Sequence, residues 1–320
     1  MMAAWLKRNV DPFIVTILVI LTLGILIPVP QSLISALTIA GKVAVMLLFL
    51  VYGARLSTRE VTDSMKNGRL QVAVALATFV IFPFLGWATR VPTEAVLGPM
   101  FATGTLYLTL LPSTVQSSVT FTSIAGGNVA GAVCAATLSN IAGVVITPLL
   151  VYLVMGKSSG VDPSSILNVV VQLLIPFVLG QIAQPHVGDW VRSKKWLTRG
   201  VDHGTIFIVV ASAVCGATAR GLWSGITWGQ VGALLASSAI LLAIMLCVTW
   251  WGGKLLGLNR ADRIVLLMCG SKKSLATGLP MASIIFPAST LAAVTVPVIV
   301  FHQLQLFVCA VLARKLSLER

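Results

Sequence analysis

Long apolar segments alternate with short polar connections along the whole chain. About 20 apolar residues span a bilayer, and Gly, Pro and clusters of charge divide this chain into segments of that length. The first apolar run follows Lys7 and Arg8 as in a signal peptide, but its length and the lack of a clear cleavage site favour an uncleaved helix. The predicted fold class is an all-α polytopic membrane protein. We predict ten transmembrane helices, over 12–30, 33–55, 69–89, 95–125, 128–155, 164–185, 201–220, 230–253, 261–286 and 289–313.

Two of these segments, the fourth and the ninth, are interrupted by polar residues. The fourth contains 111–118 (LPSTVQSS), and the ninth contains 269–280 (CGSKKSLATGLP). Gln116 and Lys272 are 156 positions apart, close to half of the chain. Discontinuous helices at matching positions of two halves indicate the binding site of a transporter. Since each half has five helices, we predict two repeats that are inverted in the membrane, 1–155 and 156–320.

Lys272 and Lys273 stand next to each other near the centre of the ninth segment. A lysine at bilayer depth costs about 2.5–3.5 kcal/mol on insertion scales, so a pair requires a reason. The alternatives are lysines that snorkel to the surface or that pair with buried carboxylates. Neighbours on a helix point about 100° apart, however, and no carboxylate lies at that depth in the predicted helices. A functional role is therefore favoured for this pair, whereas snorkelling is the better account of Lys42.

Further polar side chains lie inside the predicted spans. Ser139 and Asn140 occur midway along the fifth helix, where hydrogen bonding between helices and a binding site are equally good explanations. The run 302–305 (HQLQ) in the tenth helix is denser than packing requires, which favours a site. The turn at 126–128 (GGN) is interpreted as a connection first, because Gly and Asn tolerate positive φ angles.

The composition is typical of a membrane protein, because 57% of the 320 residues are hydrophobic and only 10% are charged. The net charge of +13 does not indicate nucleic-acid binding, since the chain has no basic face and no patch of basic and aromatic residues. With both termini in the cytoplasm, the positive-inside rule accounts for the basic residues, and we expect a multi-pass protein of the cell inner membrane. The sixteen cytoplasmic positions are Lys7, Arg8, Arg55, Arg59, Lys66, Arg69, Arg192, Lys194, Lys195, Arg199, Lys254, Arg260, Arg263, Arg314, Lys315 and Arg320, and the three opposite ones are Arg90, Lys157 and Arg220.

The sequence contains no catalytic or metal-binding signature. Its five cysteines lie in apolar segments without a CxxC pair, which predicts neither a disulfide nor a metal site. No nucleotide-binding, zinc-protease or hydrolase motif occurs, so neither an enzyme nor a cofactor is expected. All nine acids fall in predicted loops or helix ends, which argues against a sodium or proton site built on a central carboxylate.

Four stretches carry a family resemblance, namely 111–118 (LPSTVQSS), 125–128 (AGGN), 269–280 (CGSKKSLATGLP) and 301–305 (FHQLQ). Through them nearly the whole chain resembles the bile acid:sodium symporter superfamily, and GSKKS together with FHQ is typical of a divergent branch of it. The resemblance implies ten helices in two inverted repeats of five. It also implies a core domain that holds two crossed, discontinuous helices, the fourth and the ninth, and a panel domain beside it.

The chain departs from this family at the sodium-binding positions. In an ungapped match anchored on Gly270, Ser274 and His302, the family's sodium-liganding positions fall on Met268, Lys272, Ala132 and Ala136, its substrate-contacting asparagine on Lys273, and its substrate-facing His-Asn pair on His302 and Gln303. An ammonium carries the charge of a sodium ion and offers three donors. Our hypothesis is that one lysine occupies the emptied cation site while the other faces an anionic substrate, which half-helix N-termini would also favour.

We therefore predict a secondary active transporter of a small organic anion that works by alternating access, with the anion and the lipid bilayer as partners. Coupling to sodium, coupling to protons through a buried lysine, and replacement of sodium by lysine stay open, as does a homodimer. The alternative function is a non-transporting membrane regulator or sensor that uses the same cavity. The candidate substrate-binding residues are Thr114, Gln116, Ser117, Ser118, Lys273, Ser274, His302 and Gln303. The candidate residues of the cation site, or of its lysine replacement, are Ser271, Lys272, Ser139, Asn140 and Gln305.

Overall fold

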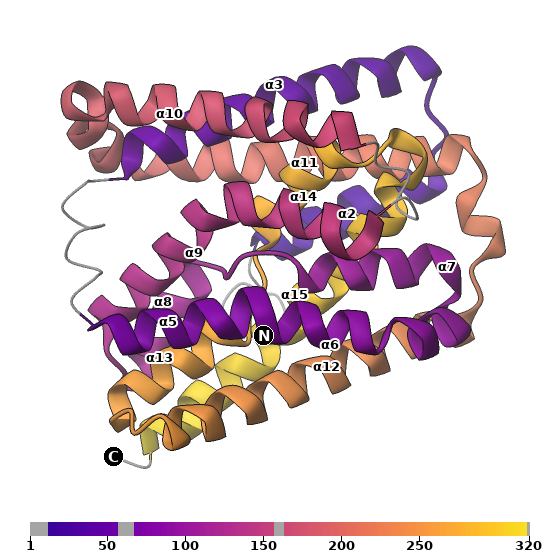
Figure 1. Ribbon diagram of the computed structural model, residues 1–320. Coiled ribbons are helices and arrows are strands. Elements are labelled where there is room, and N and C mark those ends of the chain that lie inside the picture. The colour runs from indigo at the N-terminus through magenta and orange to yellow at the C-terminus, as the bar shows by residue number, and fades with distance from the viewer. Residues whose placement is uncertain (1–11, 57–66, 157–162, 319–320) are drawn as a thin grey trace, which may run out of the picture.

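The computed structural model describes residues 12–56, 67–156 and 163–318, and within these ranges the regular structure is helical (Figure 1). The helices in chain order are α2 (Pro12–Leu26), α3 (Gln31–Arg55), α5 (Gly68–Leu76), η2 (Ala77–Ile81), α6 (Phe82–Ala88), α7 (Arg90–Thr109), α8 (Gln116–Ile124), α9 (Val129–Leu150), η3 (Val151–Met155), α10 (Pro163–Ser193), α11 (Lys195–Ala219), η5 (Leu222–Gly225), α12 (Trp228–Leu255), α13 (Arg260–Gly270), α14 (Leu275–Ile285) and α15 (Ala288–Leu318). The prediction of an all-α chain is confirmed for this part of the protein.

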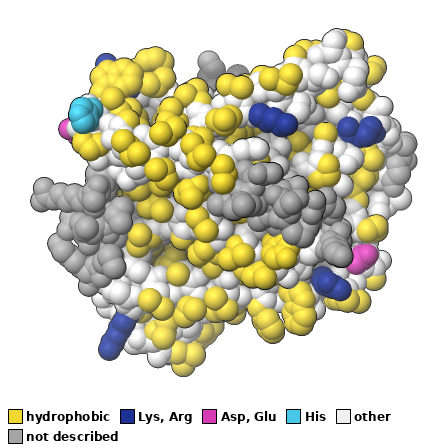
Figure 2. All heavy atoms as spheres, turned by 45° about the horizontal axis from the view of Figure 1, so that its top comes forward, with side chains coloured by type: hydrophobic (Ala, Val, Ile, Leu, Met, Phe, Trp, Pro, Cys, Tyr) yellow, Lys and Arg dark blue, Asp and Glu magenta, His cyan; other side chains and the backbone are white. Residues whose placement is uncertain are grey.

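Six stretches of the described chain are long and apolar enough to cross a membrane, and they match six of the predicted spans. They are Gln31–Arg55, Gly68–Ala88, Val129–Met155, Lys195–Ala219, Trp228–Leu255 and Ala288–Leu318. Hydrophobic side chains also cover much of the described surface in the view of Figure 2, where charged side chains are few. These features fit a polytopic membrane protein.

The fourth and ninth predicted segments are each broken into two helices, as the polar runs indicated. The chain leaves α7 at Thr109 and starts α8 at Gln116, and it leaves α13 at Gly270 and starts α14 at Leu275. Helices α13 and α14 have 11 residues each. At 1.5 Å per residue, each is about 16 Å long, roughly half of a hydrocarbon core. The two breaks therefore lie well inside the fold.

The helices form two groups that face each other. Helix α3 packs against α10 and α11, and α2 packs on α11. These helices lie in the upper part of Figure 1, with α5, α6, α12 and α13 in the lower part. Small residues permit this close contact, because a Cβ atom at Gly180 of α10 would clash with the Leu50 carbonyl oxygen of α3.

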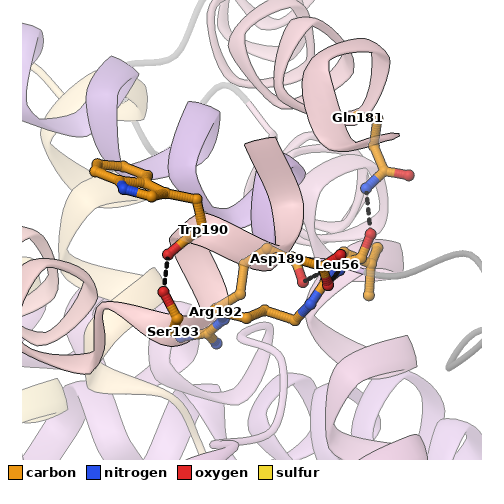
Figure 3. Close-up of polar contacts among 7 residues, drawn as sticks. Leu56, Gln181, Asp189, Trp190, Arg192 and Ser193 are labelled. Carbon is orange, nitrogen blue, oxygen red and sulfur yellow. Dashed lines mark hydrogen bonds and ion pairs between the residues drawn. The ribbon is translucent and has the colours of Figure 1, made fainter. Parts of the chain in front are cut away.

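Polar side chains of α10 complete the end of α3 (Figure 3). The Gln181 Nε2 donates to the carbonyl oxygens of Gly53 and Leu56, at 2.5 and 3.0 Å. The Arg192 Nη1 donates to the Arg55 carbonyl oxygen at 3.0 Å. The last carbonyls of a helix have no partner within the helix, so these bonds fix α3 to α10 at the end where Arg55 lies.

Most basic residues of the described chain gather at one set of helix ends. The end of α3, the α10–α11 connection, the α12–α13 connection and the end of α15 lie together on the left of Figure 1. The start of α7, with Arg90, and the end of α11, next to Arg220, lie at the opposite side. The predicted partition of charge thus follows the fold in this part of the chain. The positions Lys7, Arg8, Arg59, Lys66, Lys157 and Arg320 lie outside the described residues.

Candidate functional site

The two helix breaks contact each other directly. The Ser113 hydroxyl donates to the Cys269 carbonyl oxygen at 2.6 Å, and the Ser274 amide donates to the Pro112 carbonyl oxygen at 2.9 Å. Each break therefore supplies partners for the backbone groups that the other leaves unpaired. Three more hydroxyls donate to backbone carbonyl oxygens beside the breaks. Ser118 donates to Met268 at 2.9 Å, Thr147 to Leu110 at 2.9 Å and Ser271 to Leu267 at 2.5 Å.

Lys273 fills a closed site made of backbone carbonyls. Its Nζ donates to the carbonyl oxygens of Leu111 and Thr78, at 2.7 and 2.9 Å, and lies 4.2 Å from the centre of the Phe82 ring. Leu111 follows the C-terminal end of α7, where the helix dipole is negative. Thr78 lies in the π-helix η2, a type of turn that disturbs the regular hydrogen-bond ladder. The side chain is buried, and the ammonium has the surroundings expected of a bound cation.

Lys272 is also buried, but its contacts are looser. Its Nζ lies 3.4 Å from the Ser117 hydroxyl and 4.6 Å from the centre of the Phe121 ring, both on α8. Neither lysine forms an ion pair with a carboxylate of the described residues. The pair was predicted to diverge because neighbours on a helix point apart, yet 272 and 273 lie in the non-helical break, so the break itself sets their directions.

Helix α15 holds the break between α13 and α14 through Gln305. The Gln305 Oε1 accepts from the Lys273 amide, and its Nε2 donates to the Lys273 carbonyl oxygen, both at 2.8 Å. The same Nε2 lies 2.8 Å from the Nδ1 of His302. Gln305 is thus bound to the backbone of Lys273, and through it α15 fixes the lysine's position.

Helix α9 holds the break between α7 and α8 in the same manner. The Ser113 amide donates to the Ser139 hydroxyl at 2.9 Å, and the Asn140 Nδ2 donates to the Ser113 carbonyl oxygen at 2.7 Å. Asn140 also donates to the Ala136 carbonyl oxygen at 2.8 Å. Both explanations that the sequence left open for this pair keep support, because these bonds join α9 to the break while Asn140 also lines the cavity described next.

A cavity of 830 Å³ lies beside the breaks, between the two groups of helices. The first residues of α8, Gln116 and Ser117, line it, and so does Ser274, whose hydroxyl caps the Thr277 amide at the start of α14. The predicted site residues that line this cavity are Thr114, Gln116, Ser117, Asn140, Ser274, His302 and Gln303. Those that do not line it are Ser118, Ser139, Ser271, Lys272, Lys273 and Gln305.

The opposite wall of the cavity holds polar and charged residues that sequence reasoning did not assign to the site. They are Tyr52 and Arg55 of α3 and Arg199, Asp202 and His203 of α11. Helix α11 begins at 195 instead of the predicted 201, so Asp202 lies about two turns inside the helix. The expectation that every acid falls in a loop or at a helix end is therefore wrong for Asp202. The spacing 199, 202, 203 and 206, which marks one helix face, could have revealed it.

A second buried carboxylate, that of Asp262, joins three helix starts. It accepts hydrogen bonds from the Nδ2 atoms of Asn67, Asn128 and Asn259, at 3.0, 2.8 and 3.1 Å. These asparagines are the N-caps of α5, α9 and α13. In the turn that leads into α9, Gly126 has a φ angle of 73°, as expected of a tight turn. The connection before α9 is thus structural, as predicted.

The helical fold, the two broken segments and the cavity between helix groups define a polytopic membrane protein of the transporter class. The model of the SBF-like CPA transporter family matches residues 11–318, and the chain belongs to this family. The expected resemblance to the bile acid:sodium symporter superfamily is thereby confirmed, including its divergent branch.

Several curated relatives carry transporter names. YfeH of Escherichia coli strain K12, a symporter by name, is 41% identical over 312 residues, which cover 97% of this chain and 94% of the relative. Sodium/bile acid cotransporter 7 of Xenopus tropicalis is 28% identical over 274 residues, covering 84% and 80%, and that of Mus musculus is 26% identical over 274 residues, covering 84% and 81%. The family and these relatives point to a transporter and not to an enzyme.

Proposed function

We propose that this protein is a secondary active transporter of a small organic anion. The observation that carries the proposal is that two half-helices, α8 and α14, both begin at the wall of the 830 Å³ cavity. The N-terminal end of a helix is positive and presents free amide groups, which favours an anion. Arg55 and Arg199 add charge of the same sign from the opposite wall. We assign the anion to Gln116, Ser117, Ser274, His302 and Gln303, together with these two arginines.

The proposed mechanism is alternating access between the two helix groups. Helices α2, α3, α10 and α11 would form the panel domain, and α5–α9 with α12–α15 the core domain. The remaining broken and short segments would complete ten spans in two inverted repeats, 1–155 and 156–320. Because the basic helix ends gather on one side, we place both termini in the cytoplasm and the protein in the cell inner membrane.

For coupling, we propose that Lys273 replaces the sodium ion of the wider family. Its ammonium binds two carbonyl oxygens next to the breaks and lies over a ring, so no free cation is needed to neutralise them. Lys273, which the sequence indicated as a substrate-binding residue, is thus assigned to the cation site instead. Lys272 supports the same region through α8, and neither lysine is proposed to touch the anion.

Ligand binding to the purified protein tests this proposal. The melting temperature would be measured with a series of organic carboxylates and sulfonates, with either sodium or choline as the cation, because a ligand of the folded state stabilises it. We expect stabilisation by at least one anion and no difference between the cations. If the anion raises the melting temperature of Arg55→Gln as much as that of the wild type, the proposed anion site is contradicted. If sodium alone raises the melting temperature, the lysine replacement is contradicted.

Flux separates the transporter from a sensor that uses the same cavity. The anion that stabilises the protein best would be loaded inside vesicles that contain it, and entry of labelled anion would be followed. A transporter exchanges the two pools, whereas a sensor binds without exchange. Arg55→Gln, which removes one positive charge from the cavity wall, is expected to lower the exchange of a transporter.

A further inference from the structure

We propose that Asp202 binds a proton together with the substrate anion, which makes the protein a proton–anion symporter. This inference rests on the proposed function, since it concerns the same cavity, but it adds a site that the family's sodium positions do not include. Asp202 is the one carboxylate among the described residues that line the cavity. It lies on α11, on the wall opposite the starts of α8 and α14.

The surroundings of this carboxylate leave it incompletely paired. Its Oδ1 is buried without a hydrogen-bond partner in the described part of the chain. The Tyr52 hydroxyl of α3 faces the carboxyl as a donor, and the charges that act on the carboxyl are those of Arg55 and His203. A buried carboxylate oxygen without a donor is costly, whereas a protonated carboxyl carries no charge to solvate. The geometry thus suits a group that exchanges a proton.

The two arginines provide the link between proton and anion. Arg55 faces Asp202 from α3, and its positive charge favours the ionised carboxylate while the cavity is empty. Arg199 lies one helical turn before Asp202 and lines the same cavity. An anion that binds between these arginines and the helix starts cancels that effect, and the carboxylate then takes up a proton. Because linkage is reciprocal, the proton in turn strengthens anion binding. One proton and one anion enter together, and the only bond that forms on entry and breaks on release is the O–H bond of the carboxyl.

Other titratable groups reach the same cavity and must be separated from Asp202. Within the described residues, they are Tyr52 and Arg55 from α3, Arg199 and His203 from α11, and His302 from α15. Helices α2, α8, α9 and α14 contribute no titratable side chain to the described lining. Only the two imidazoles have ordinary titration ranges near neutrality, so they are the competitors that the experiment has to exclude.

The test measures anion affinity as a function of pH with alkyl- and arylsulfonates, whose own charge is constant over the range. For the wild type, we expect the affinity to rise as the pH falls, by up to about tenfold per pH unit when one proton is linked to one anion. Asp202→Asn is expected to bind with an affinity independent of pH. Asp202→Glu, which keeps a carboxyl, should retain the slope. Asp189→Asn is the matched control, because Asp189 is an exposed acid on α10 and should behave as wild type.

The outcomes separate this inference from the proposed function. An unchanged slope in Asp202→Asn, or a slope that His203→Gln or His302→Gln abolishes while Asp202→Asn keeps it, would overturn the proton site but leave the anion site. A pH-independent affinity in the wild type would do the same. No binding of any sulfonate or carboxylate at any pH would refute the anion cavity itself. If Asp202→Asn does not fold, Asp202→Ser removes the carboxyl in a smaller side chain and takes the same measurement.

Discussion

At the scale of single residues, the two lysines that the sequence treated as one motif have different surroundings. Lys273 meets two carbonyl oxygens and a ring face, whereas Lys272 has a hydroxyl at 3.4 Å and a ring. Removing one partner of a buried polar pair leaves the other without compensation, and that cost exceeds the value of the pair. The two side chains should therefore differ in their contribution to the free energy of unfolding.

We expect Lys273→Met to lower the stability of the protein by about 2–4 kcal/mol, because the Leu111 and Thr78 carbonyls lose their donor. Lys272→Met should cost less, since only one long hydrogen bond is lost. The melting temperatures of the two variants in one detergent give the comparison. A larger loss in Lys272→Met would show that the carbonyl site is not the principal role of the pair.

At the scale of elements, the chain joins short helices by their ends. The sequence predicted both breaks, because proline, glycine and polar runs interrupt the fourth and ninth apolar segments. It also singled out Ser139, Asn140 and Gln305, which hold those breaks. The wall formed by α3 and α11 was missed, because the apolar pattern of α11 starts after its true helix start. Arg199 precedes that pattern and Asp202 lies at its very start, so their charge suggested a connection and a helix end.

The three helix starts around Asp262 give a prediction at this scale. Asp262→Ala removes the acceptor shared by three N-cap asparagines, so α5, α9 and α13 lose their common anchor, and we expect a loss of about 2–4 kcal/mol. Asp189→Ala is the control, because Asp189 is exposed and a surface change of this kind stays within about 0.5 kcal/mol. Equal melting temperatures for the two variants would contradict this role of Asp262.

At the scale of the whole molecule, the fold separates the charge of the chain into two sides. Helix α11 shows this by itself, since its start carries Lys195 and Arg199 and its end is followed by Arg220. Only the apolar pattern and the count of spans were needed to predict that separation. The absolute direction in the membrane is a proposal that rests on the positive-inside rule, and it has its own test.

Labelling of single cysteines tests the orientation. In a Cys247→Ser background, Asp189→Cys is expected to react with a membrane-impermeant maleimide only after the cytoplasmic side is opened, whereas Arg220→Cys should react from outside in intact cells. Both positions are exposed in the structure, so reagent access is not limited by packing. The reverse pattern would invert the topology, and labelling of both from one side would refute the separation.

If Lys273 replaces the sodium ion as proposed, the carbonyl site around it changes which energy source can drive transport. A free ion occupies its site according to its concentration, and it must enter and leave in every cycle. The Lys273 ammonium is covalently part of the chain, so its effective concentration at the carbonyl site is fixed and it cannot leave the protein. Two binding modules joined by a linker have the same advantage over separate ones. Such a carrier would have no ion-loading step and no dependence on external salt. It would also have lost the means to draw work from a sodium gradient, so uphill transport would need another source.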